Sequence, residues 1–267
     1  YFGDDLAQLA FIAMVVAAVG GVALALFFPM LAGSDPTRRL KAIAADRAST
    51  MHSRMPTQPR AQSPQVNSGF ARHASAALRK ANPKREIIVI PPEMAFGTGD
   101  HATTSTCLRL LVDVARSRKG TDWTVADLGT GTGVLAIAAK KLGAGETYAC
   151  DFDPFAVAVG IRNIARNNTP DILMKEQDVL KWKPHKKGYD VVMANLFSTI
   201  LIEAWPVIAK SLAPGGDLIV SGILATQAWE VFKAAATNGI GFTKVVKKGK
   251  WVTAHGGHLA DLIAAGA

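Results

Sequence analysis

Three glycines in a short loop are the first residues whose spacing suggests chemistry. Gly129, Gly131 and Gly133 follow the apolar run at 124–128 and precede a helical pattern. Glycine lets the backbone take strained turns and approach a ligand closely, and parallel α/β sheets bind ligands beyond the carboxyl ends of their strands. The dinucleotide fingerprint would need a glycine where this chain has Val134, and the phosphate-binding P-loop pattern is absent. We therefore expect a ligand that contacts the loop and contains neither a pyrophosphate nor a triphosphate.

An acidic residue ends the next predicted strand, roughly 20 residues further along the chain. Asp151 stands there and is followed by Asp153 and Pro154. A carboxylate in this place can accept hydrogen bonds from both hydroxyls of a ribose. The alternative role for Asp151 is a helix N-cap, for which Asp153 is better placed. S-adenosylmethionine has a ribose and no phosphate, so the pattern predicts this cofactor.

Two further polar residues follow predicted strands at the same edge of the sheet. Asp178 comes after the third strand and can accept a hydrogen bond from an adenine amino group, or it is only a surface turn residue. Asn195 ends the fourth strand, and its amide carries both a donor and an acceptor. We expect Asn195 to orient the methionine tail or the incoming nucleophile, with a turn-capping role as the alternative.

The segment 91–111 is rich in glycine and hydroxyl side chains and contains His101. It lacks the lysine of a phosphate loop and the spaced ligands of a metal site, so we expect no metal and interpret the segment as a lid. His101 is a candidate catalytic base, although a loop-structuring or substrate-lining role is favoured because methyl transfer to a neutral amine needs no strong base. Phe96 and Trp251 are candidates to line the acceptor channel, with core packing as the alternative for Trp251.

Alternating strand and helix patterns must position these residues. Such alternation predicts an α/β fold with a mainly parallel sheet covered on both faces. We expect strands at 85–90, 124–128, 146–151, 172–177, 189–196 and 217–222, helices at 103–118, 134–144, 154–167, 199–212 and 225–238, and a C-terminal antiparallel hairpin at 242–256 with its turn near Gly249.

Five blocks of this region together resemble the bacterial PrmA family over residues 85–256: MAFGTGDHATTSTCLRLL, VADLGTGTGVLAIAAKKLGA, ACDFDPFAVAVGIRNIARNN, DVVMANLF and LIVSGILATQAWEVFKA. These enzymes use S-adenosylmethionine to methylate amino groups of a large-subunit ribosomal protein. The resemblance implies a Rossmann-like, seven-stranded class I methyltransferase sheet. It also implies cofactor contacts at Thr104, Gly129, Asp151 and Asn195.

A long uncharged run stands near the start of the chain. Residues 6–34 contain no charged residue, and about 20 apolar residues suffice to cross a bilayer. Arg38, Arg39 and Lys41 follow it, so the positive-inside rule places the C-terminal domain in the cytoplasm. We expect a transmembrane helix in 1–34, a basic flexible linker in 35–84 and a methyltransferase domain in 85–267. If the N-terminal segment is foreign to the enzyme or is removed, a cytoplasmic protein is expected instead.

The N-terminal segment also raises the question of the substrate. The stretch FFPMLAGSDPTRRLKAIAADRAS faintly resembles membrane proteins of tight-adherence pilus assembly. The PrmA family carries a substrate-recognition domain where this chain has the apolar run and the linker. We therefore expect a ribosomal or membrane-associated protein as methyl acceptor, and no direct contact with nucleic acid, because the net charge of +9 comes disproportionately from the first 80 residues.

Three other functions remain open. They are a small-molecule methyltransferase on the same scaffold, a membrane-tethered domain that binds the cofactor without catalysis, and a nicotinamide oxidoreductase, which Val134 disfavours.

Overall fold

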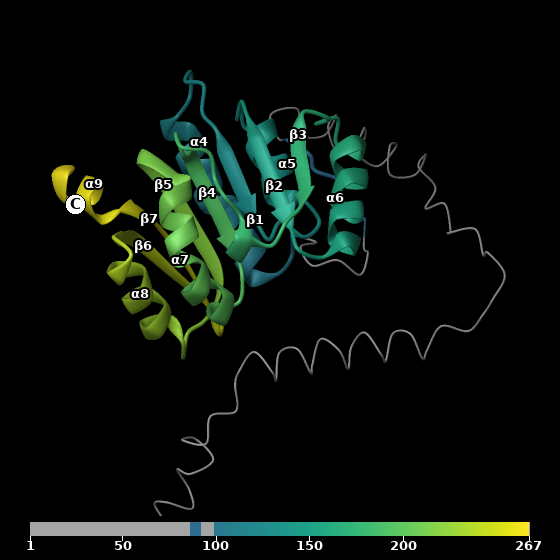
Figure 1. The fold of residues 1–267 in the computed structure, drawn as a ribbon. Helices are drawn as coiled ribbons and strands as arrows, with labels where there is room; N and C mark the ends of the chain where they lie inside the picture. The colour runs from purple at the N-terminus through teal and green to yellow at the C-terminus, as the bar shows by residue number, and fades with distance from the viewer. Residues whose placement is uncertain (1–85, 92–98, 267) are drawn as a thin grey trace, which may run out of the picture. The chain divides into compact units, whose positions relative to one another are not determined.

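A mixed β-sheet forms the centre of the fold (Figure 1). The computed structural model describes residues 86–91 and 99–266. Within them the sheet has seven strands in the order β3-β2-β1-β4-β5-β7-β6. The first five strands in this order run parallel, and β7 is antiparallel to both β5 and β6. The strands are β1 Val125–Leu128, β2 Thr147–Asp151, β3 Ile172–Glu176, β4 Tyr189–Asn195, β5 Leu212–Leu224, β6 Ile240–Lys248 and β7 Trp251–His258.

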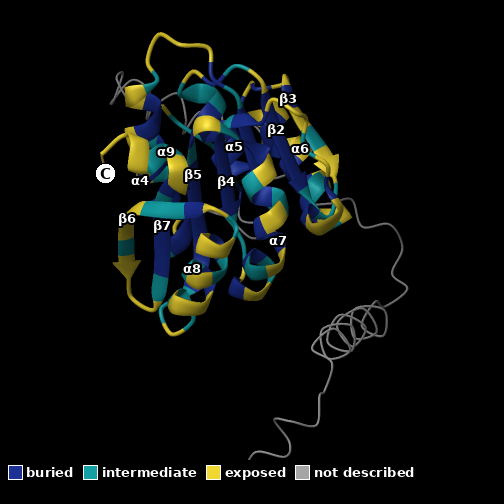
Figure 2. Cartoon of the chain, turned by 60° about the vertical axis from the view of Figure 1, so that its left-hand side comes forward, coloured by how far each residue is buried: buried dark blue, intermediate teal, exposed yellow. Residues whose placement is uncertain are grey.

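Helices cover both faces of this sheet. Apolar side chains of α4 and α5 pack with those of β1, β4 and β5 on one face, where α6 lies against β2 and β3. On the other face α7 and α8 bury a second cluster around Trp205. Figure 2 shows the central strands buried between these layers. The helices are α4 Ala102–Ser117, α5 Val134–Lys141, α6 Pro154–Arg166, α7 Ser198–Ser211, α8 Ala228–Thr237, α9 Leu259–Ala264 and the short 3-10 helix η1 Val179–Lys181.

Most predicted elements are confirmed, with shifts of a few residues at their ends. The predicted α/β class, the parallel arrangement and the antiparallel C-terminal hairpin are all present, and the hairpin turns at Gly249 with φ of 61°. The prediction missed η1 and α9, which are each too short for helical periodicity to reveal them.

The predicted strand at 85–90 is wrong, because the described part of it, residues 86–90, is not in a strand. A side chain takes the place of a neighbouring strand there. The Asn167 side chain accepts a hydrogen bond from the Val89 amide at 2.8 Å and donates one to the Val89 carbonyl at 2.9 Å. Ile88 and Ile90 pack against the core. The alternating apolar pattern therefore reflects burial of an extended segment, without a ladder of backbone hydrogen bonds.

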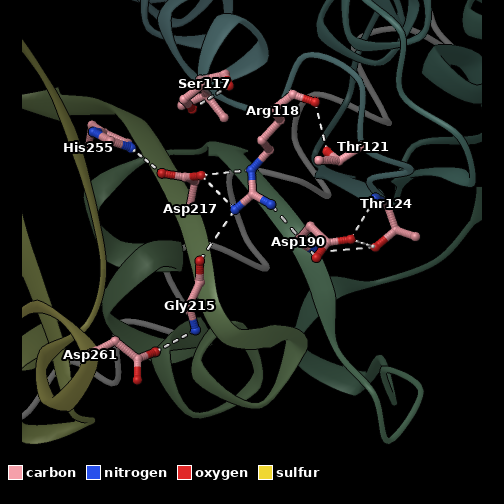
Figure 3. Close-up of polar contacts among 10 residues, drawn as sticks. Ser117, Arg118, Thr121, Thr124, Asp190, Gly215, Asp217, His255 and Asp261 are labelled. Atoms are coloured by element: carbon pink, nitrogen blue, oxygen red, sulfur yellow. Dashed lines mark hydrogen bonds and ion pairs between the residues drawn. The ribbon is translucent and has the colours of Figure 1, made fainter. Parts of the chain in front are cut away.

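A polar network ties together the amino ends of three parallel strands (Figure 3). Arg118 donates to Asp217 through Nε at 2.9 Å and through a terminal nitrogen at 2.7 Å, and its other terminal nitrogen lies 3.8 Å from Asp190. Nε2 of His255 lies 2.8 Å from the second oxygen of Asp217. Asp190 accepts from the Thr124 amide and hydroxyl, each at 2.8 Å. The loop after α4 is thereby joined to β1, β4, β5 and β7 at the sheet edge opposite the glycine loop.

The membrane prediction concerns residues that the structure does not describe. Residues 6–34, the linker at 35–84 and Phe96 lie outside 86–91 and 99–266, so these remain predictions. Among the residues that are described, we find no helix with the length and apolar character needed to cross a membrane.

Candidate active site

The glycine loop joins β1 to α5 in a conformation that favours glycine. Gly129, Gly131 and Gly133 have φ of 71°, 56° and 81°, in the left-handed region that L side chains rarely adopt. The amides of Gly129 and Thr130 both donate to the Cys150 carbonyl at 2.9 Å, which fastens the loop to the end of β2. A Cβ at Gly129 would also collide with the side chain of Leu196, the residue after Asn195. The loop is thus held between the ends of β2 and β4.

The carboxylate of Asp151, at the end of β2, binds this loop. One oxygen accepts from the Gly131 amide at 2.9 Å, and the other accepts from the Asp153 amide at 3.1 Å. Burial raises the pKa of Asp151, and the two amide donors oppose this effect. Asp153 caps α6 by accepting from the Phe155 amide at 2.8 Å, as predicted, so Asp151 is not the helix cap. Each Asp151 oxygen retains a lone pair for a further donor.

Two buried polar side chains stiffen the loop from behind, and the sequence analysis missed both. Asp127 is 1% exposed and accepts from the Thr130 hydroxyl at 2.5 Å and the Ala136 amide at 3.1 Å. Burial raises its pKa to about 7. Asn163 is fully buried in α6 and donates to the Thr132 carbonyl at 3.0 Å. The signal for Asp127 was an acid inside an otherwise apolar strand, where it must have partners.

A second group of predicted residues forms a chain of contacts at the end of β4. The Asn195 amide donates to the Thr103 hydroxyl at 3.4 Å, and that hydroxyl lies 2.8 Å from Nδ1 of His101. The His101 ring meets the Trp251 ring edge-on with centroids 5.2 Å apart. Thr103 is the link that sequence reasoning missed; it is 1% exposed. Asn195, His101 and Trp251 are therefore brought together, as one site requires.

The contacts of His101 indicate which ring nitrogen carries the proton when the ring is neutral. His101 is the N-cap of α4, and its Nδ1 accepts from the Thr103 amide at 3.4 Å. A backbone amide can only donate, so Nδ1 carries a lone pair, and we infer that neutral His101 holds its proton on Nε2. The Nδ1 lone pair already receives two donors from Thr103. This arrangement favours the structuring role over the role of catalytic base.

Thr104 lies one residue further into the first turn of α4. Its side chain is 1% exposed, and its hydroxyl has no hydrogen-bond partner among the residues that the structure describes. A buried hydroxyl without a partner costs free energy, about 1–3 kcal/mol in protein mutational data. The hydroxyl thus fits a bound group that would supply the missing hydrogen bond.

Asp178 follows β3, whose end lies beside Asp151, since the Gln177 amide donates to the Asp151 carbonyl at 2.8 Å. One Asp178 oxygen caps η1 by accepting from the Leu180 amide at 2.9 Å, and the other lies 3.7 Å from Lys181. Asp178 therefore has the turn role that was its alternative. Its contact with an adenine stays a prediction.

Comparison with known proteins identifies the family. The family described as ribosomal protein L11 methyltransferase (PrmA) matches residues 70–258. Proteins of that name from Allorhizobium ampelinum and Myxococcus xanthus are 36% identical over 196 residues and 41% identical over 165 residues. The matched regions cover 70% and 62% of this chain but only 64% and 55% of those proteins.

A solved structure agrees with these matches. The crystal structure of ribosomal protein L11 methylase from Lactobacillus delbrueckii subsp. bulgaricus has a TM-score of 0.57 and 30% identity, and the match covers 65% of this chain and 86% of that one. The family match begins at residue 70, so it offers no support for the pilus-assembly resemblance at the N-terminus. The matched region contains both the glycine loop and the cluster of His101, Trp251 and Asn195. This chain belongs to the ribosomal protein L11 methyltransferase (PrmA) family.

Proposed function

We propose that this protein transfers a methyl group from S-adenosylmethionine to an amino group of a protein. The observation that carries the proposal is the placement of two groups at one edge of the sheet. The Asp151 side chain binds the glycine loop, and the chain of contacts through Asn195, Thr103 and His101 lies at the end of β4. Leu196, which follows Asn195, packs against Gly129 of the loop.

The described residues fit the cofactor. Asp151 would accept hydrogen bonds from the ribose hydroxyls, because its two oxygens each keep a lone pair after binding the Gly131 and Asp153 amides. The left-handed backbone at Gly129, Gly131 and Gly133 would let the loop approach the ligand closely. Thr104 would use its unpartnered hydroxyl on the ligand. Asp178 would reach the adenine amino group if its side chain rotated away from the Leu180 amide that it caps.

The protein's part in the reaction would be mainly positioning, which can supply about 7–11 kcal/mol of a barrier at most. When bound, the cofactor supplies a methyl group already activated by its sulfonium. Asn195 would orient the acceptor amine, with its amide fixed by Thr103. The amine must be neutral to attack, and a lysine has an ordinary pKa of about 10.4. His101, Trp251 and Phe96 would surround the amine with weakly polar walls, which lower its pKa through desolvation.

A ribosomal protein is the first acceptor to test, because the relatives are named for methylating L11. A membrane-associated protein is the second, because of the uncharged run at 6–34. We further infer from that run that the chain is anchored in a membrane with residues 85–267 in the cytoplasm. Extraction of the chain from membranes by carbonate would contradict the anchor.

Titration calorimetry on the full chain tests the cofactor. We expect binding of S-adenosylmethionine and of its demethylated product, S-adenosylhomocysteine, at one site. No heat with either ligand, from protein whose circular dichroism shows a folded domain, would overturn the proposal. Binding without methyl transfer to any amine would instead leave a non-catalytic domain.

A further inference from the structure

Two aromatic side chains project into solvent beside the candidate active site. Phe197 is 68% exposed and follows Asn195 by two residues, and Trp229 is 77% exposed in the first turn of α8. Both stand beyond the carboxyl ends of parallel strands, after β4 and β5 respectively. Large aromatic side chains in water are unfavourable, and where they gather on a surface they mark binding sites.

Backbone contacts place these residues on the rim of the site. The Leu196 amide donates to the Ser221 carbonyl at 3.1 Å, which sets Phe197 beside the end of β5. The Ala225 amide donates to the Lys250 carbonyl at 2.9 Å, so the turn before Trp229 lies against the β6–β7 turn. Leu224 of β5 pairs with Trp251 of β7, whose ring contacts His101. The contacts therefore run around the mouth of the site from Asn195 back to His101.

The β6–β7 turn adds positive charge to this rim. Lys247, Lys248 and Lys250 are exposed. The Lys250 ammonium lies 5.4 Å from the centre of the Trp251 ring, and the Lys248 ammonium donates to the Ser105 hydroxyl at 3.1 Å. These contacts hold two of the three charges at the mouth. In Figure 2 this turn and the exposed side of α8 lie at the same end of the molecule.

Residues 244–251, which include the β6–β7 turn, contain no acidic residue, whereas Glu230 beside Trp229 and Asp100 beside His101 are exposed acids at other points of the rim. The rim thus presents an aromatic side, Phe197 and Trp229, and a basic side, the three lysines. We call these residues the acceptor rim.

We propose that the acceptor rim docks a segment of the acceptor protein in which the target amine has an apolar residue on one side and an acidic residue on the other. The inference rests on the proposed function and specifies its substrate. The apolar residue would cover Phe197 and Trp229, and the acid would face the lysines. Aromatic residues in such positions carry much of the binding free energy of protein interfaces, and the lysines supply the complementary charge.

Methylation of short peptides by the full chain tests this docking surface. Each peptide carries one lysine with leucine on one side and aspartate, serine or arginine on the other, made in both orders. Transfer of labelled methyl from S-adenosylmethionine gives kcat/KM. We expect the aspartate peptide of one order to exceed the serine peptide about fivefold, in the range of a few exposed ion pairs. The Lys247→Gln/Lys248→Gln/Lys250→Gln variant should bring this ratio close to one.

Matched variants distinguish the effect of the acceptor rim from that of positive charge elsewhere on the surface. Lys183→Gln/Lys186→Gln/Lys187→Gln removes the same charge from the exposed loop before β4, at the opposite edge, and should keep the ratio. A fourth peptide, with serine in place of the leucine and aspartate kept on the other side, measures the apolar contact, and Trp229→Ser should remove the preference of the native chain for leucine over this serine. Ile263→Ser, at a residue of α9 that is 69% exposed, should retain it.

Equal rates on all three peptides in both orders would overturn the docking surface and leave the methyltransferase intact. A preference for the arginine peptide, or inhibition by a short RNA that the lysine variant relieves, would overturn it in favour of a nucleic-acid surface. If no peptide is methylated while calorimetry shows cofactor binding, docking of a protein segment is also wrong. Loss of cofactor binding itself would count against the proposed function.

Discussion

At the residue scale, two acids only two positions apart have separate roles. Asp151 contacts the glycine loop, whereas Asp153 caps α6. Both are aspartates after a strand, so residue type alone cannot distinguish them. The structure distinguishes them by their partners.

Asp151→Ala should weaken binding of S-adenosylmethionine at least about tenfold, the loss of a charge-assisted pair of hydrogen bonds. Because burial raises the pKa of Asp151, affinity should also begin to fall at a higher pH than for an ordinary aspartate as the solution is acidified. Calorimetry between neutral pH and acid measures both. Asp153→Ala is the control: it should cost about 1 kcal/mol of stability as a lost cap and keep most of the affinity. Equal affinity in the two variants would mean that Asp151 does not hold the ribose.

His101→Asn separates a helix cap from a catalytic base. Asparagine can cap α4 through its side-chain oxygen but cannot accept a proton. If His101 structures the loop, kcat/KM should stay within about tenfold of the native protein, since general-base catalysis contributes about 10²–10⁴-fold. His101→Ala should lower the unfolding free energy by about 1 kcal/mol. A loss of about a hundredfold or more in kcat/KM in the asparagine variant, with normal stability, would instead support His101 as the catalytic base.

Several site residues could be predicted from the sequence because their position after a strand is itself the signal. The glycines, Asp151 and Asn195 all stand at such ends. Thr103 and Asn163 could not be predicted, because each acts through a partner far away in the chain. His101 could be noticed but its role could not be assigned, since the role depends on which nitrogen accepts from Thr103.

At the element scale, helix α6 supports the glycine loop. Its buried Asn163 donates to the Thr132 carbonyl, and Gly160 lets the helix pack closely on β3, because a Cβ there would come within 2.7 Å of the Met174 side chain. The helix itself follows from Pro154 at its first turn and the Asp153 cap. The elements with strong periodicity were predictable, whereas the 86–91 segment was not, because its strand-like pattern is satisfied by the Asn167 side chain.

Asn163→Ala should lower the unfolding free energy by about 1 kcal/mol, since it removes a buried hydrogen bond to the Thr132 carbonyl. It should also weaken cofactor binding by loosening the loop. Chemical denaturation and calorimetry measure the two effects. Ala165→Gln is the control, because Ala165 is an exposed residue of the same helix, so the unfolding free energy should change by less than about 0.5 kcal/mol. Unchanged affinity in Asn163→Ala would mean that α6 does not set the loop conformation.

At the scale of the whole domain, the two edges of the sheet are held by different chemistry. The carboxyl edge carries the site, while the amino edge carries the network of Arg118, Asp190, Asp217 and His255. The network joins strands that are distant in sequence, and hence no local pattern predicted it. In the described part of the chain, the ion pair between two strand residues, His255 and Asp217, belongs to this network at the amino edge.

Asp217→Asn should lower the unfolding free energy by about 2 kcal/mol near neutral pH, as expected for a hydrogen bond to a charged group. Burial by itself would raise the pKa of Asp217, but hydrogen bonds from His255 and Arg118 outweigh it and hold the pKa below its usual value. The contribution is therefore present above the ordinary pKa of about 3.9 and is lost as the pH falls through the lower folded value. Urea denaturation from pH 3 to pH 7 measures the difference between the two proteins.

Asp113→Asn provides the comparison, because its ion pairs with Arg116 and Lys244 are exposed and should contribute less than about 0.5 kcal/mol. A difference between native protein and Asp217→Asn that grows as the pH falls would contradict the assignment of the network.

The most direct test of the central claim is methyl transfer itself. The full chain is incubated with methyl-labelled S-adenosylmethionine and with separate ribosomal and membrane protein fractions, and labelled proteins are digested and sequenced by mass spectrometry. We predict label on lysine side chains or α-amino groups of one or a few proteins, and little or none with Asp151→Ala. Label only on small molecules, or equal labelling by the Asp151→Ala variant, would contradict the account.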